Sequence, residues 1–158
     1  MAGITTTTRH STYHVGTAAI DEATMQLLCG ALAEEALRLI AQEHETGTDP
    51  NGTSWVPNKS WKDFYGWGLQ VLELTGTLMN SWRSVARSNG FTILNHTEYA
   101  NVQDRGGKVG RGVVLPPRPM LPTSEELPPK WQAAFDAITK RILDEHIRRV
   151  LPGAEIID

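Results

Sequence analysis

The chain has 158 residues, a net charge of −3 at pH 7 and a composition that is 40% hydrophobic and 21% charged. This length suits a single domain that buries roughly 70% of the surface its unfolded chain exposes. The slightly acidic balance gives no general reason to expect nucleic-acid binding, and no apolar run reaches the ~20 residues of a membrane span. The N-terminus lacks the basic start and apolar centre of a signal peptide, so we expect a protein made and kept in a cytoplasm.

The N-terminal residues divide into an expected arm and an expected helix. Residues 1–16 are rich in threonine and show no helical periodicity, which predicts an arm that is either disordered or extended along another surface. Residues 21–45 are predicted to form an amphipathic helix, with Asp21 as its N-cap and Gly47 at its end. Its apolar residues repeat at three- and four-residue spacing and are expected to form one buried stripe: Met25, Leu28, Cys29, Leu32, Ala36, Leu39 and Ile40.

The next segment combines turn residues with aromatic ones. Asp49-Pro50-Asn51-Gly52 has the composition of a tight turn, and Trp55 is expected to attach that turn to the core. An aromatic cluster follows, made of Trp61, Phe64, Tyr65 and Trp67. Two interpretations stay open: the cluster packs beneath a loop, or Trp61 and Trp67 are exposed anchors of an interface.

A β-hairpin is predicted after residues 69–77, which lead into it through a short turn. Alternate residues of its first strand would face opposite sides, with Trp82, Ser84 and Ala86 on one side and Arg83, Val85 and Arg87 on the other. Ser88-Asn89-Gly90 supplies the turn, and Phe91 and Ile93 resume the alternation in the return strand.

A short helix and a basic loop are predicted next. The helix lies between Glu98 and Gly107, and the loop continues from Arg105 to Arg118 with glycines that make it costly to order. Prolines 116, 117 and 119 indicate an edge strand or a rigid extended connector, because proline lacks the N–H that a central strand donates.

The last predicted element is a long helix over about residues 128–150. Thr123 and Glu126 have the spacing of a capping box, and Pro128-Pro129 suits a helix start. Its apolar face comprises Trp131, Phe135, Ile138 and Ile142, extended by Leu143, Ile147 and Val150. We expect Leu28, Leu32, Leu39, Trp131, Phe135 and Ile138 to be buried, with the two long helices packed against the sheet or each other.

No motif for catalysis, a cofactor or a metal emerges from the sequence. His10 and His14 have the spacing of a helical metal pair, but the threonine-rich arm disfavours a helix. His44, at a helix end, is interpreted as an imidazolium that complements the helix dipole. The glycine-rich run 106–112 lacks the spacing and context of a phosphate loop, which sets nucleotide binding aside. Cys29 is the only cysteine and is interpreted as a buried, inert thiol.

Charge is distributed unevenly along the chain. Residues 21–45 carry six acids and one base, whereas a later run has four cations and no acid: Arg105, Lys108, Arg111 and Arg118. These four cations are candidate interface residues, as are Trp61 and Trp67. This separation of acidic and basic segments suits a subunit that contacts different partners on different sides, and a solvated surface explains it equally well.

Four short motifs lie in order between the two long helices. Asp49-Pro50-Asn51-Gly52 with Trp55 comes first, then Leu74-Thr75-Gly76-Thr77-Leu78 with Ser81, then Tyr99-Ala100 before Gly106-Gly107, and last Pro117-Arg118-Pro119. Over roughly residues 21–150 this order resembles the phage virion morphogenesis family, the tail-completion proteins of Mu-like and related tailed phages.

The resemblance implies a small α+β subunit in which two long amphipathic helices, N- and C-terminal, pack on a small antiparallel sheet. From the sequence itself, we expect the chain to divide into an extended N-terminal arm (residues 1–16), a single α+β domain (residues 17–151) and a C-terminal tail (residues 152–158), and the arm and the tail have no counterpart in the family pattern. The implied function is that of a structural virion protein at the head–tail neck, assembled in the host bacterial cytoplasm. It would form a ring that completes the tail or joins tail to head, without catalytic residues or cofactors.

The implied partners are further copies of the chain, in a ring of six or alternatively twelve, and adjacent neck, tail-tube or connector proteins. Packaged DNA would pass through the channel without sequence recognition, and no membrane is involved. The runner-up is a small nucleic-acid-binding regulator that uses the basic loop 105–118. A hydrolase without a recognisable motif ranks third.

Overall fold

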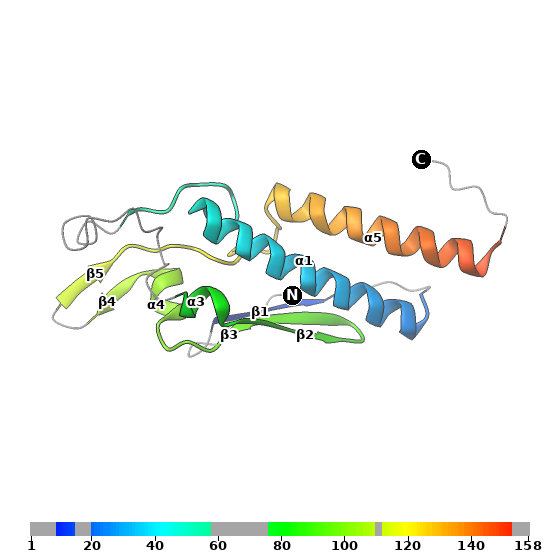
Figure 1. The fold of residues 1–158 in the computed structure, drawn as a ribbon, viewed down its shortest axis with the longest axis horizontal. Coiled ribbons are helices and arrows are strands. Elements are labelled where there is room, and N and C mark those ends of the chain that lie inside the picture. The colour runs from blue at the N-terminus through cyan, green and yellow to red at the C-terminus, as the bar shows by residue number, and fades with distance from the viewer. Residues whose placement is uncertain (1–8, 15–19, 58–75, 110–111, 153–158) are drawn as a thin grey trace.

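A computed structural model describes residues 9–14, 20–57, 76–109 and 112–152. Helix α1 (Glu22–Thr46) lies between helix α5 (Pro129–Val150) and a three-stranded sheet (Figure 1). A hairpin of β4 (Gly107–Val109) and β5 (Val113–Leu115) lies at one end of the elongated subunit. The fold class is therefore α+β, with two long helices and a small antiparallel sheet, as the sequence predicted.

Helix α1 forms as its sequence predicted. Asp21 caps its N-terminus, where Oδ1 accepts a hydrogen bond of 2.8 Å from the backbone N–H of Thr24. Gly47 ends it in the left-handed conformation, with φ of 65°, and donates its N–H to the Glu43 carbonyl. All seven residues of the predicted apolar stripe are buried, and Cys29 lies among them fully buried. Burial raises the pKa of the Cys29 thiol, which keeps it protonated and inert.

The main sheet has the strand order β1-β3-β2, with both outer strands antiparallel to β3. The predicted hairpin is β2 (Trp82–Arg87) and β3 (Gly90–Asn95), and Gly90 pairs with Arg87, which leaves a two-residue loop. Trp82, Phe91 and Ile93 are buried, while Val85 is 45% exposed, so the sheet has a covered and an open face. Strand β1 (Arg9–His14) comes from the expected N-terminal arm and completes the sheet.

Helix α5 packs along α1 with the first two thirds of its apolar stripe. Trp131, Phe135 and Ile142 are buried, and Ile138 is partly buried. The Phe135 ring contacts the Phe91 ring of β3 edge-on, with 5.9 Å between the ring centroids. The stripe continues to Val150, which is 56% exposed. The predicted capping box is wrong: the helix begins at Pro129 with Pro128 in the N-cap position and no side-chain cap, because proline already presets the first turn.

Two short helices connect the larger elements. Helix α3 (Thr77–Asn80) precedes β2, and helix α4 (Ala100–Arg105) lies between β3 and β4. Several predictions fall outside the described residues: residues 1–8 and 15–16 of the arm, the whole aromatic cluster from Trp61 to Trp67, residues 69–75 before the hairpin, Arg111 and nearly all of the C-terminal tail.

Candidate assembly site

Three of the four motifs, far apart in sequence, meet at the base of the β4–β5 hairpin. Asp49 organises the first turn, since its Oδ1 accepts from the backbone N–H groups of Asn51 (2.9 Å) and Thr53 (2.8 Å). The turn leads to Trp55, which is 5% exposed and whose Nε1 donates to the Pro119 carbonyl at 3.0 Å. The predicted attachment of this turn to the core is confirmed, and its anchor point is the proline-rich connector.

Arg118 lies inside the subunit, with only 2% of its surface exposed. Its Nε donates to the Val56 carbonyl and its Nη1 to Gln103 Oε1, both at 3.1 Å, while its backbone N–H donates to the Gln103 carbonyl at 2.9 Å. Burial lowers the pKa of the guanidinium. Arg118 is thus removed from the exposed basic loop of the sequence prediction, because its Nε and Nη1 donate to carbonyl groups of the fold, while the buried Nη2 has no hydrogen-bond partner among the described residues.

Helix α4 is tied to the same connector. Asp104 is 2% exposed, and its Oδ1 accepts from the backbone N–H of Met120 at 2.8 Å. Gly106, with φ of 71°, closes the contact: a Cβ there would lie 2.7 Å from the Leu115 carbonyl oxygen and 2.8 Å from the Pro117 nitrogen. We call this set the hairpin joint: Trp55, Gln103, Asp104, Gly106 and Arg118. It fixes the direction in which the hairpin leaves the subunit.

The hairpin itself is exposed. Val113 is 53% and Val114 is 66% exposed, and Lys108, which pairs with Val114 across the strands, is exposed as well. Arg105 is exposed at the end of α4. Of the six candidate interface residues, the structure thus brings Arg105 and Lys108 to the hairpin surface, buries Arg118, and does not describe the other three.

The sequence analysis did not predict the burial of two titratable groups near the end of α1. Glu43 is 1% exposed and its Oε1 accepts from Trp131 Nε1 at 2.7 Å, while His44 is 4% exposed and its Nε2 accepts from Trp82 Nε1 at 3.2 Å. Burial raises the pKa of Glu43 to about 7 and lowers that of His44 to about 4. His44 is therefore neutral at pH 7, and its interpretation as an imidazolium at the helix end is wrong.

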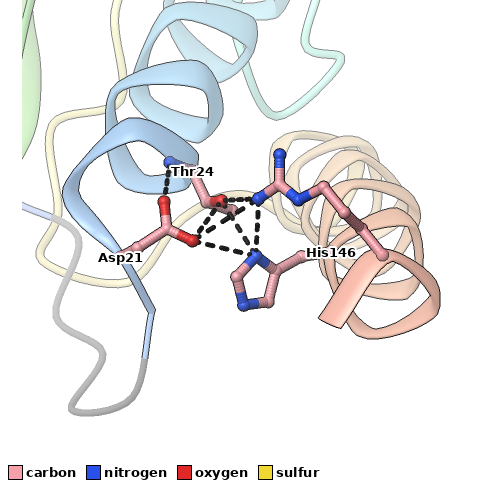
Figure 2. A network of polar contacts seen from close by, with 4 residues as sticks. Asp21, Thr24 and His146 are labelled. Atoms are coloured by element: carbon pink, nitrogen blue, oxygen red, sulfur yellow. Dashed lines mark hydrogen bonds and ion pairs between the residues drawn. The ribbon is translucent and has the colours of Figure 1, made fainter. Parts of the chain in front are cut away.

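A polar network joins the opposite ends of the two long helices (Figure 2). Arg149 Nη2 of α5 donates to Thr24 Oγ1 of α1 at 2.8 Å and lies 3.4 Å from Asp21 Oδ2. His146 Nδ1 lies 2.9 Å from the same hydroxyl and 3.2 Å from Asp21 Oδ2. The hydrogen bond from the Thr24 backbone N–H, and then the one from the Thr24 hydroxyl, lower the pKa of Asp21. The network fixes the antiparallel alignment of α1 and α5.

The described residues hold no group of three or more His, Cys, Asp or Glu side chains that could bind a metal ion. His10 and His14 lie on strand β1 and not on a helix, so their four-residue spacing is not that of a helical metal pair. Within the same residues, no helix has the length and apolar character needed to cross a membrane.

Comparison with known proteins gives a family match. The model of the phage virion morphogenesis family matches residues 13–143, which include α1, the main hairpin, the hairpin joint and most of α5. No curated protein and no solved structure is significantly similar to the chain. Since the match covers well over half of the sequence, the chain belongs to the phage virion morphogenesis family.

Proposed function

We propose that this protein is a structural component of the phage neck that forms a ring and either completes the tail or joins tail to head. Family membership supports a structural role in virion morphogenesis rather than a catalytic one. The proposed ring has six copies, with twelve as the alternative, and its neighbours are neck, tail-tube or connector proteins.

The observation that carries this proposal is the exposed β4–β5 hairpin. Each strand has three residues, and successive residues of a strand face opposite sides, so exposed Val113 and Val114 show that neither side is covered. A two-stranded hairpin is marginal by itself. This one is nevertheless held in a fixed direction by the buried hydrogen bonds of Arg118 and Trp55. An element that is apolar, exposed and fixed in place suits a contact with another protein chain.

A ring also suits the proposed position at the head–tail neck of the virion. Cyclic assembly satisfies identical contacts on every subunit without open ends, and a central channel lets packaged DNA pass without sequence recognition. Assembly would take place in the host bacterial cytoplasm, with the finished ring in the virion. The alternative of a nucleic-acid-binding regulator loses support from the burial of Arg118, since one of the four cations of the basic loop cannot reach a phosphate.

The proposal is tested by the oligomeric state of the purified chain and by the symmetry of the neck in a cryo-EM reconstruction of the virion. We expect a closed ring in the virion. If ring formation needs no partner protein, the purified chain should also form a ring in solution at assembly concentrations. A chain that is monomeric in solution and also absent from any ring in the virion would contradict the proposal.

A further inference from the structure

Helix α1 carries a glycine that its own subunit does not require. Gly30 lies inside the N-terminal half of the helix and is partly exposed, and a Cβ built there meets no atom within 4 Å. A helical glycine costs roughly 0.5–1 kcal/mol relative to alanine. Neither a special φ nor a close contact among the described residues accounts for that cost here.

The surface around Gly30 is apolar and acidic. Leu27, three residues earlier, is 57% exposed, and Glu34, four residues later, is also exposed, so all three share one side of the helix. The single base of α1, Arg38, is bound by Glu35 in a bidentate ion pair, which leaves this side negative. We call Leu27, Gly30 and Glu34 the α1 acceptor surface.

The β4–β5 hairpin offers the complementary groups. Lys108 and Val114 are directly paired across the strands and therefore lie on the same face of the hairpin. On α1 the exposed leucine and glutamate lie two helical turns apart, about 10 Å, with Gly30 between them. An exposed valine with a long, exposed lysine beside it can match them in both apolar character and sign of charge, because the lysine side chain extends past the valine. The absence of a side chain at Gly30 leaves room for a strand to approach the helix closely.

These two surfaces cannot meet within one chain. The hairpin lies at one end of the subunit, whereas the N-terminal half of α1, drawn in blue, extends toward the other end (Figure 1). The match is thus available only between two copies, placed head to tail. Contacts of this kind join two different surfaces and generate a ring when the rotation closes.

We infer that the β4–β5 hairpin of one subunit docks on the α1 acceptor surface of the next copy. Val114 packs on Leu27 over Gly30, and Lys108 forms an ion pair with Glu34. This inference rests on the proposed ring and names the contact that builds it.

Cysteine cross-linking tests the apolar half of the contact. The chain with Leu27→Cys and Val114→Cys is oxidised both as purified protein and in particles assembled with it, and the native Cys29 does not interfere because it is fully buried. We expect a ladder of covalent oligomers. The matched control combines Leu27→Cys with Val85→Cys, an exposed valine of the main sheet, and should remain uncross-linked. A dimer from Val114→Cys alone would overturn the inference, because it would show that hairpins pair with each other.

Charge exchange tests the polar half. Lys108→Glu alone and Glu34→Lys alone should each weaken association at least about tenfold by placing like charges together. An equal mixture of the two variants should recover the ring, since alternating subunits again oppose unlike charges at every contact. Glu125→Lys, at an exposed acid before α5, should associate normally.

The outcomes separate the inference from the proposed function. Rings without the cross-linked ladder, or single variants that assemble normally, would overturn the docking contact and leave the ring in place. A chain that is monomeric in solution and forms no ring in the particle would overturn both.

Discussion

Replacing three glycines by alanine separates the physical demands on the hairpin joint. Gly106 has a positive φ of 71° and backbone atoms within 2.8 Å of the added Cβ. Gly112 has a similar φ of 77° but no atom within 4 Å, and Gly30 has neither demand. The series therefore distinguishes strain with a clash, strain alone, and neither.

The expected free energies follow from these differences. Gly112→Ala should destabilise the fold by about 1–2 kcal/mol, the cost of a left-handed alanine. Gly106→Ala should impose the same strain and should also push Leu115 and Pro117 away. Each hydrogen bond of the connector that weakens as they move should cost about 1 kcal/mol more, so the total destabilisation should be about 3 kcal/mol. Gly30→Ala should stabilise the free subunit by about 0.5–1 kcal/mol through its better helix propensity.

Urea denaturation measures these changes, and hydrogen exchange at the backbone amides of Arg118 and Met120 reports whether the joint opens locally. Those amides donate to the Gln103 carbonyl and to Asp104, so a displaced connector exposes them first. The reasoning fails if Gly106→Ala unfolds at the same urea concentration as Gly112→Ala while both amides keep their wild-type exchange rates.

Three further changes test the core, the buried acid and the basic loop. Leu32→Ala should lower the free energy of unfolding by about 2–5 kcal/mol, because the side chain is 4% exposed. Leu27→Ala, at an exposed position, should change it by less than about 0.5 kcal/mol. Equal melting temperatures for the two variants would contradict the buried face of α1. Glu43 keeps its proton in the folded state up to about pH 7, whereas the unfolded chain loses it near 4.5, so wild-type Glu43 lowers stability as pH rises through that window. Glu43→Gln should remove this loss of stability. The free energy of unfolding of the variant should then rise more steeply than that of the wild type between about pH 4 and 6.5, where neutral His44 favours the folded state. Urea titrations at several pH values in which the two free energies of unfolding change in parallel would argue against this prediction. Changing Lys108 and Arg111 together to glutamate should block infectious particles while circular dichroism shows an intact fold, and normal joining of heads to tails would reduce the loop to a solvated turn.

The sequence was sufficient for elements whose signals are local. The three- and four-residue spacing of apolar residues predicted α1 and α5, and strict alternation with a short turn predicted β2 and β3, because both periodicities follow from backbone geometry. The threonine-rich arm was harder. Its β-branched residues favour extended structure, but the partner of β1 lies in β3, about 80 residues later, and no local pattern indicates it.

The hairpin joint depended on information that no single segment contains. Arg118 looked exposed because it stands among prolines in a basic run, and its burial follows from a carbonyl at Val56 and an amide at Gln103, 62 and 15 residues away. Glu43 could have been found, since it lies four residues after Leu39 and three after Ile40 and so continues the apolar stripe. Its charge led the sequence analysis to count it with the acidic surface.

The burial of Arg118 and Asp104 fits a subunit that must present its hairpin in one direction. Polar groups in a core contribute less stability than apolar ones of the same volume, but each hydrogen bond they make admits few geometries. Arg118 contacts the loop after Trp55 and helix α4 at once, so rotation of the hairpin would break the hydrogen bonds of both Nε and Nη1 in a buried guanidinium. A hairpin fixed before association loses less conformational entropy when it docks on a neighbour. On this argument three of the four weak sequence motifs belong together because they build one joint, and the joint determines the angle at which one subunit meets the next.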